Sequence, residues 1–203
     1  MLEKTIKARC SEGTRPSLLL HACCAPCSSY VLEYLCRYFD ITLFFYNPNI
    51  SPKEEHDFRH RELVRLTEEM GLSDTVKIME GAYEPQRFYE LSKGLEELPE
   101  GGARCAKCYA LRLEESAKIA AEGGYDFYTT TLSISPYKNA EWLNEIGKEK
   151  GEKYGVEYLF SDFKKKNGYK RSCELSEIYG LYRQDYCGCE FSRREKEKKC
   201  AKH

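Results

Sequence analysis

Residues 17–29, SLLLHACCAPCSS, decide the fold class of this chain and also hold its densest group of cysteines. The first part, residues 17–22, is an apolar run with the length and composition of a buried strand. Residues 28–39 follow at once, with apolar side chains at helical spacing. A buried strand that passes through a short loop into a helix is the beginning of an α/β unit.

The same alternation continues along the chain. Further strands are predicted at residues 41–46, 76–79, 127–132 and 156–160, and helices at residues 51–71, 85–93, 106–122 and 139–154. Ser51 is expected to cap the first of these helices, with Pro52 at its first position. Because strands and helices alternate, the sequence predicts a mostly parallel, Rossmann-like sheet with helices on both faces.

The C-terminal part, residues 161–203, is rich in lysine and aromatic residues. Helices are predicted there at residues 173–182 and from Ser192 onward. No repeat or low-complexity stretch separates this part from the rest. Residues 1–203 are therefore expected to form a single α/β domain that ends in a basic, helical segment.

The composition bears on partners and location. The chain has 203 residues, of which 41% are hydrophobic and 32% charged, as in a globular protein with a charged surface. Its apolar stretches are too short to cross a bilayer, and its first residues, MLEKTIKARCSEG, lack the apolar core of a signal peptide. A cytoplasmic protein without a membrane partner is therefore expected. The net charge of −1 neither favours nor excludes a nucleic-acid partner.

The cysteine content is high for a chain in a reducing compartment, where structural disulfides are rare. Eleven cysteines are present, and an odd number cannot all pair within one chain. They indicate metal ligation, redox chemistry or burial as small apolar side chains. The isolated cysteines are expected to be structural: Cys10, Cys36, Cys173 and Cys200. His21, inside the first strand, is expected to be a hydrogen-bonded core histidine.

The first of three cysteine groups is HACCAPC, with Cys23, Cys24 and Cys27. It follows the first strand, at the edge where parallel sheets bind their ligands. The loop has no glycine, so it lacks the close backbone approach that a phosphate-binding loop needs. Metal binding is the better interpretation of this loop.

The second group, CAKC, supplies Cys105 and Cys108 at the start of a predicted helix. The two-residue gap lets both thiolates face one metal, and the helix N-terminus is expected to lower their pKa. The side chains of Cys23 and Cys24 diverge, which suits the separate corners of an iron cubane. These four cysteines are therefore predicted to hold a [4Fe–4S] cluster. Cys27 could replace one of them, bind a second metal or remain a free thiol.

The third group is CGC, with Cys187 and Cys189. The glycine between them lets the two sulfurs approach each other. The pair could close into an easily reduced disulfide or hold a second metal. Structural zinc is the alternative metal for the whole set of cysteines.

HACCAPC, CAKC and YCGC together resemble the QueH family of epoxyqueuosine reductases. The resemblance covers residues 17–192 and includes YNPNI after the second strand and TTTLSISPYKN after the CAKC helix. It implies a fold similar to that of the adenine nucleotide alpha-hydrolases, without the use of ATP. It also implies the last step of queuosine biosynthesis, in which the epoxide on a tRNA-borne base is reduced to a cyclopentene.

The resemblance further implies which residues form the site. The ligands of the [4Fe–4S] cluster would be Cys23, Cys24, Cys105 and Cys108. Cys187 and Cys189 would form a redox-active pair or bind a second, mononuclear iron. Reduction of an epoxide to an alkene consumes two electrons and two protons. No flavin, nicotinamide or cobalamin motif is present in the sequence, so an external electron donor is expected.

Proton donation and tRNA binding need further residues. The candidates for the proton donor, by position alone, are Tyr137, Asp185 and Tyr186. The aromatic and basic residues expected to meet an extruded base are Tyr169, Lys170 and Arg171. A solvated, charged loop explains the lysines at residues 164–166 equally well.

Two other functions fit much of the same pattern. An ATP-dependent iron–sulfur enzyme of tRNA thiolation would share the sheet and the cysteines, but it needs a glycine-serine phosphate loop that HACCAPC does not provide. A non-catalytic zinc-binding module would also be rich in cysteine, but colourless. Measurements of ATP binding and of metal content separate these hypotheses.

Overall fold

The computed structural model describes residues 2–10 and 15–201. Within them, five parallel strands form one sheet with the order β3-β2-β1-β4-β5. The strands are β1 (Ser17–His21), β2 (Asp40–Phe45), β3 (Lys77–Glu80), β4 (Phe127–Thr130) and β5 (Glu157–Tyr158). The predicted alternation of strands and helices, and the parallel sheet that follows from it, are confirmed.

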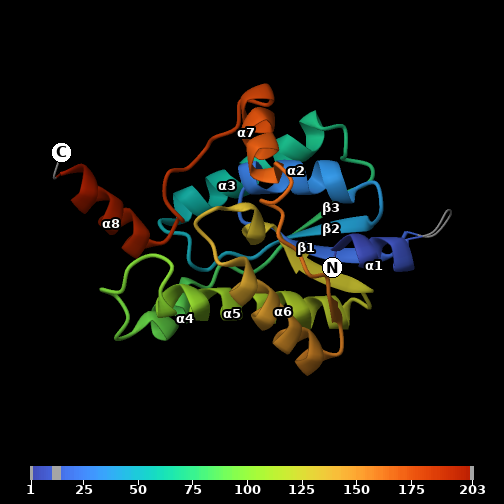
Figure 1. The fold of residues 1–203 in the computed structure, drawn as a ribbon. Coiled ribbons are helices and arrows are strands. Elements are labelled where there is room, and N and C mark those ends of the chain that lie inside the picture. The colour runs from blue at the N-terminus through green and yellow to red at the C-terminus, as the bar shows by residue number, and fades with distance from the viewer. Residues whose placement is uncertain (1, 11–14, 202–203) are drawn as a thin grey trace.

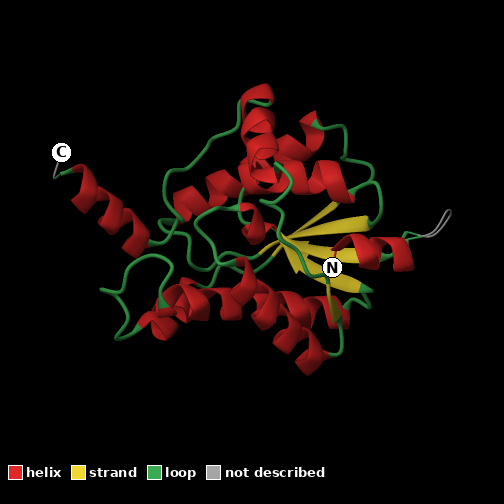
Figure 2. Cartoon of the chain, in the orientation of Figure 1, coloured by secondary structure: helices red, strands yellow, loops and turns green. Residues whose placement is uncertain are grey.

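Eight α-helices and one 3₁₀ turn occur among the described residues. They are α1 (Leu2–Arg9), α2 (Ala25–Leu35), α3 (Lys53–Glu69), α4 (Pro85–Ser92), α5 (Ala103–Glu122), the turn η1 (Thr131–Ile134), α6 (Ala140–Tyr154), α7 (Gly168–Ile178) and α8 (Glu190–Cys200). Helices α2, α3 and α7 lie on one side of the sheet and α4, α5 and α6 on the other, while α8 extends away from the body (Figures 1 and 2). None of these helices combines the length and the apolar composition that crossing a bilayer requires.

The central strand β1 is buried on both faces, which explains its uninterrupted apolar sequence. Leu18 and Leu20 point to one side, where they join a core with residues of α2 and α3. Leu19 points to the other side and packs with residues of α5 and α6. Successive side chains of a strand face opposite ways, so a strand covered on both faces needs apolar residues at every position.

The strand order reverses direction between β1 and β4, which lie side by side with His21 opposite Thr130. In an open parallel sheet, the chain leaves such neighbouring strands toward opposite faces, and a crevice forms at their carboxyl ends. The HACCAPC loop follows β1 at this point, and the η1 turn follows β4. The fold therefore places the first cysteine group at the crevice.

Several element boundaries differ from the sequence predictions. Helix α3 begins at Lys53, after Pro52, and no side chain caps it. The predictions that Ser51 caps this helix and that Pro52 is its first residue are wrong: Pro52 is the N-cap residue, and the Ser51 hydroxyl oxygen instead accepts a hydrogen bond from the Tyr89 hydroxyl at 3.4 Å. The two C-terminal helices exist, but α7 begins at Gly168 and α8 at Glu190, before the predicted positions.

Gly147 on α6 is required by close packing. A Cβ at this position would overlap the ring of Tyr158, which is buried and meets Tyr128 edge to face. We expect Gly147→Ala to lower the free energy of unfolding by about 1–3 kcal/mol through overpacking, although alanine is the better helix former. Urea denaturation measures the change. Glu145→Ala, on the exposed side of the same helix, should leave stability nearly unchanged, and a stabilised Gly147→Ala variant would contradict the prediction.

Candidate metal centre

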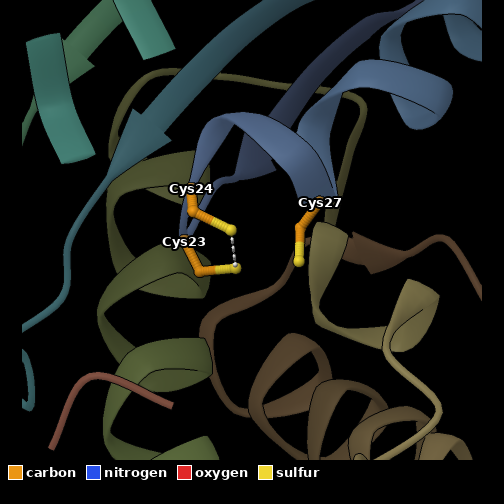
Figure 3. Close-up of side chains that lie close together, drawn as sticks. All are labelled: Cys23, Cys24 and Cys27. Atoms are coloured by element: carbon orange, nitrogen blue, oxygen red, sulfur yellow. Dashed lines mark hydrogen bonds between the residues drawn. The ribbon is translucent and has the colours of Figure 1, made fainter. Parts of the chain in front are cut away.

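Cys23, Cys24 and Cys27 form a compact group of thiols at the start of α2 (Figure 3). Their sulfur atoms all lie within 4.8 Å of one another, and the Sγ atoms of Cys23 and Cys24 are 3.6 Å apart. Cys24 is the N-cap residue of α2, and Cys27 lies on its first turn and faces the other two. Three convergent thiols on one short loop are a donor set for a soft metal centre.

The three thiols do not ionise independently. Hydrogen bonds from Cys24 and Cys27 hold the pKa of Cys23 well below the usual value of a thiol. The same hydrogen bonding raises the pKa of Cys24 to about 12 and also raises the pKa of Cys27. The group thus stabilises one thiolate, and a metal that binds all three sulfurs must displace the remaining protons.

Cys105 and Cys108 lie on the first two turns of α5. Burial raises the pKa of Cys105, and it raises the pKa of Cys108 to about 12. The prediction that the helix N-terminus lowers both values is wrong, because the loss of hydration outweighs the effect of the helix. The Gly101 N–H, which donates to the Cys105 sulfur at 3.3 Å, and the charges of Lys138 and Arg104 lower the pKa of Cys105, but they do not offset its burial.

The CGC turn approaches the CAKC helix. Cys189 is buried in one apolar cluster with Cys108 and Phe88. Cys187 is half-buried and accepts a hydrogen bond from the Lys138 ammonium, with 3.3 Å between Nζ and Sγ. All eleven cysteines are free thiols in the structure. The second and third cysteine groups therefore meet, although about eighty residues separate them in the chain.

A buried arginine connects the cysteine groups. Arg112 lies one helical turn after Cys108, is 1% exposed, and donates to the side chains of His21 and Asn47. Burial alone would lower its pKa, but the thiols of Cys108 and Cys23 raise it, so the guanidinium remains a cation. No carboxylate of the described residues forms an ion pair with it.

This arrangement fits an anionic metal–thiolate centre. A charge buried without a counter-charge is strongly destabilising. The groups near Arg112 that can carry a negative charge are sulfur atoms from all three cysteine groups, namely those of Cys23, Cys108 and Cys187. Thiolates held by a metal would supply the missing negative charge.

A cavity of about 610 Å³ opens beside Cys23, Cys24 and Cys27. Its wall also contains Arg59, Arg112, Lys138 and Cys187, so it reaches two of the three cysteine groups. Its other polar and aromatic lining includes Tyr137, Tyr169, Arg183, Asp185, Tyr186, Glu195, Lys196 and Lys199. The volume is that of a site for a small organic molecule.

Comparison with known proteins identifies the family. A family model described as "Epoxyqueuosine reductase QueH" matches residues 18–195. The chain belongs to the QueH family of epoxyqueuosine reductases. QueH of Staphylococcus epidermidis is 45% identical over 196 residues, which are 95% of this chain and 82% of that protein. QueH of Streptococcus pyogenes is 43% identical over 95% of this chain and 76% of that protein. QueH of Thermotoga maritima is 37% identical over 91% of this chain and 94% of that protein.

Membership of the QueH family makes this chain an oxidoreductase and confirms the resemblance seen in the three cysteine motifs. The prediction for His21 is also confirmed, because it is fully buried and bonded to Thr130. The sequence interpretation missed three charged residues at the site: Arg59, Arg112 and Lys138. The spacing of Arg112 from Cys108, one helical turn, was a usable signal, whereas nothing local distinguishes Arg59 from the other charged residues of its helix.

Proposed function

We propose that this QueH family member reduces the epoxide of tRNA-borne epoxyqueuosine to the alkene of queuosine at a [4Fe–4S] cluster held by its cysteines. The observation that carries the proposal is Arg112, a buried cation near which the groups able to become anionic are thiols from all three cysteine groups. If iron holds these sulfurs as thiolates, their negative charge compensates the buried guanidinium, which explains why a permanently cationic side chain is stable there.

The proposed cluster ligands are Cys23, Cys24, Cys105 and Cys108. Cys187 and Cys189 form the redox-active pair or bind a second, mononuclear iron. The compact geometry of the first group supports Cys27 as an additional or alternative ligand. When bound, a low-potential cluster supplies electrons one at a time from an external donor, here an electron-donor protein or a reductant. The chain's own residues then bind the substrate, exclude water and provide protons.

The cavity supports a flat, polar substrate. Tyr137, Tyr169 and Tyr186 offer aromatic faces along its wall, on which a base taken out of its stack can lie. The three proton-donor candidates, Tyr137, Asp185 and Tyr186, all line this cavity. Asp185 forms an ion pair with Lys196, whereas a tyrosine hydroxyl is a hydrogen-bond donor, so the two tyrosines are the better candidates for donating a proton.

Basic residues at the mouth of the cavity support tRNA as the form of the substrate. Lys196 and Lys199 of α8 line the cavity, and α8 extends away from the body of the protein (Figure 1). Arg171, expected to be part of this surface, is not among the residues that line the cavity, and it is paired with Glu33 and Glu174. The proposed phosphate-binding surface is Lys196 and Lys199, which would exchange their present partners, Asp185 and Glu195, for phosphates, and Tyr169 lines the same cavity.

We expect the double variant Lys196→Ala, Lys199→Ala to bind an anticodon stem-loop more weakly and with a smaller salt dependence. Each lysine that neutralises a phosphate contributes about one unit to the slope of log affinity against log salt concentration. Filter binding across a salt series measures both quantities. Lys148→Ala, an exposed lysine of α6, is the control. An unchanged slope in the double variant would remove α8 from the RNA-binding surface.

The finer fold assignment belongs to the same proposal. The strand order matches the doubly wound, Rossmann-like arrangement, and we propose likeness to the adenine nucleotide alpha-hydrolases. The crevice that holds a nucleotide in such folds is occupied here by a glycine-free cysteine loop.

Anaerobic purification followed by iron, sulfide and ATP-binding measurements tests the proposal. Iron and sulfide without ATP binding are expected. Zinc alone would favour a structural module, and ATP binding would favour a thiolation enzyme.

A further inference from the structure

Arg59 of α3 reaches from its helix to the CGC turn. It is 2% exposed, and its Nη1 donates to the carbonyl of Cys187 at 3.1 Å. Its guanidinium lies 5.4 Å from the centre of the Tyr186 ring. On the helix side, its Nε donates to Glu55 at 2.8 Å. Glu55, on the same helix, thus orients the guanidinium, which contacts Tyr186 and the Cys187 carbonyl of the turn.

The contact between Arg59 and the CGC turn requires a glycine at position 188. Its φ of +110° lies in the region that favours glycine. A Cβ here would lie 2.9 Å from Nη1 of Arg59 and 3.1 Å from Cγ1 of Ile50. The Gly188 carbonyl also accepts a hydrogen bond from the Ser51 N–H. The turn is therefore pressed against Arg59 and held to the segment that precedes α3.

Arg59 also shares a cavity with cysteines of the first and third groups. Arg59, Cys24 and Cys187 all line the same cavity, although they come from α3, the start of α2 and the C-terminal turn. The Cys187 thiol meets Lys138 on its other side. A displacement of the turn would therefore move Cys187 relative to the first cysteine group and to any substrate in the cavity.

We propose that Arg59 is a positioning residue for epoxide reduction: it fixes the Tyr186–Cys189 turn so that Cys187 lines the cavity together with Cys24. The inference rests on the proposed role of Cys187 in the reaction. The planar guanidinium bonds Glu55 and the Cys187 carbonyl at once and lies against Tyr186, a combination that the single ammonium of a lysine does not reproduce.

Arg59→Lys in the anaerobically loaded holoprotein tests this role, with Arg61→Lys, an exposed position on the same helix, as the matched control. We expect iron and sulfide contents to match the wild type. We expect the alkylation rate of Cys187 by iodoacetamide, followed by peptide mass mapping, to rise about tenfold, as loss of one charged hydrogen bond predicts. The value of kcat should fall by a similar factor, while KM for the RNA stays unchanged.

Gly188→Ala keeps Arg59 but disturbs the contact between Arg59 and the CGC turn. This variant therefore tests whether that contact positions Cys187 if Arg59→Lys does not load its metal. Faster Cys187 alkylation and a lower kcat in either variant support the inference. Wild-type alkylation and kcat in a loaded variant overturn it. Cys187→Ser separates this inference from the proposed function: wild-type turnover there would remove Cys187 from the reaction, whereas the alkylation rates would still report whether Arg59 holds the turn.

Discussion

Cys23→Ser is expected to abolish the iron–sulfur absorbance of the anaerobically prepared protein. We also expect it to lower the rate of epoxide reduction by more than ~100-fold. Loss of a partner that only supports a metal ligand already costs about 10–100-fold, and Cys23 is central to the site. Its sulfur lies 3.6 Å from that of Cys24 and within 4.8 Å of that of Cys27. Iron and sulfide analysis with a turnover assay measures the effect.

Cys36→Ser is the matched control, because Cys36 is the C-cap residue of α2, at the opposite end of that helix from Cys24, and packs partly buried against the core. It should retain the cluster and the activity. The same assays applied to Cys27→Ser and Cys105→Ser decide which completes the ligand set. If Cys105→Ser keeps a full cluster while Cys27→Ser loses it, the predicted set must exchange one for the other. A full cluster in Cys23→Ser would contradict the proposed centre altogether.

Arg112→Met is expected to produce a protein that loads iron poorly and is strongly destabilised when loaded. Removing one partner of a buried pair of charges costs about 3–5 kcal/mol, because the other charge is left uncompensated. Methionine has a similar length and is apolar, so packing is disturbed little. In the molecules that do load, the reduction potential should fall, since a nearby positive charge stabilises the more negative, reduced state. Potentiometric titration followed by EPR measures the potential.

Lys107→Met serves as the control for Arg112→Met. Lys107 lies on the same helix between the two cysteines of CAKC, but it is exposed. Its replacement removes the same charge from the protein without removing one from the site, so loading and potential should stay close to the wild type. An Arg112→Met variant with wild-type iron content and potential would show that Arg112 does not compensate the charge of the metal centre.

Local sequence patterns predicted the five strands and seven of the eight helices of the described residues, all but α1, but they did not predict the order of the strands in the sheet. The apolar run of β1 predicted a strand buried on both faces, and it is one. The predicted strand at 127–132 ends early, because the Thr130 hydroxyl accepts a hydrogen bond from the Leu132 N–H and begins the η1 turn. The placement of β4 beside β1 depends on contacts between distant segments, which no local pattern encodes.

The candidate site shows the same division. Residue type and spacing identified the three cysteine groups, because thiols in pairs with short gaps have few other uses in a reducing compartment. Spacing could not show that Cys108 and Cys189 share one buried cluster, or that Cys27 joins Cys23 and Cys24. It also could not assign Arg59, whose partner is a backbone carbonyl 128 residues away. The ligand set and the single-domain organisation remain predictions.

The most direct test of the central claim is turnover by the reconstituted protein. The anaerobically loaded holoprotein and a chemical reductant are incubated with an RNA stem-loop that carries epoxyqueuosine, and the nucleosides are then analysed by mass spectrometry. The account predicts conversion to queuosine, with loss of one oxygen atom, at a rate that depends on the iron and sulfide content. Conversion by an iron-free, zinc-loaded preparation, or no conversion by a fully loaded one, would contradict it.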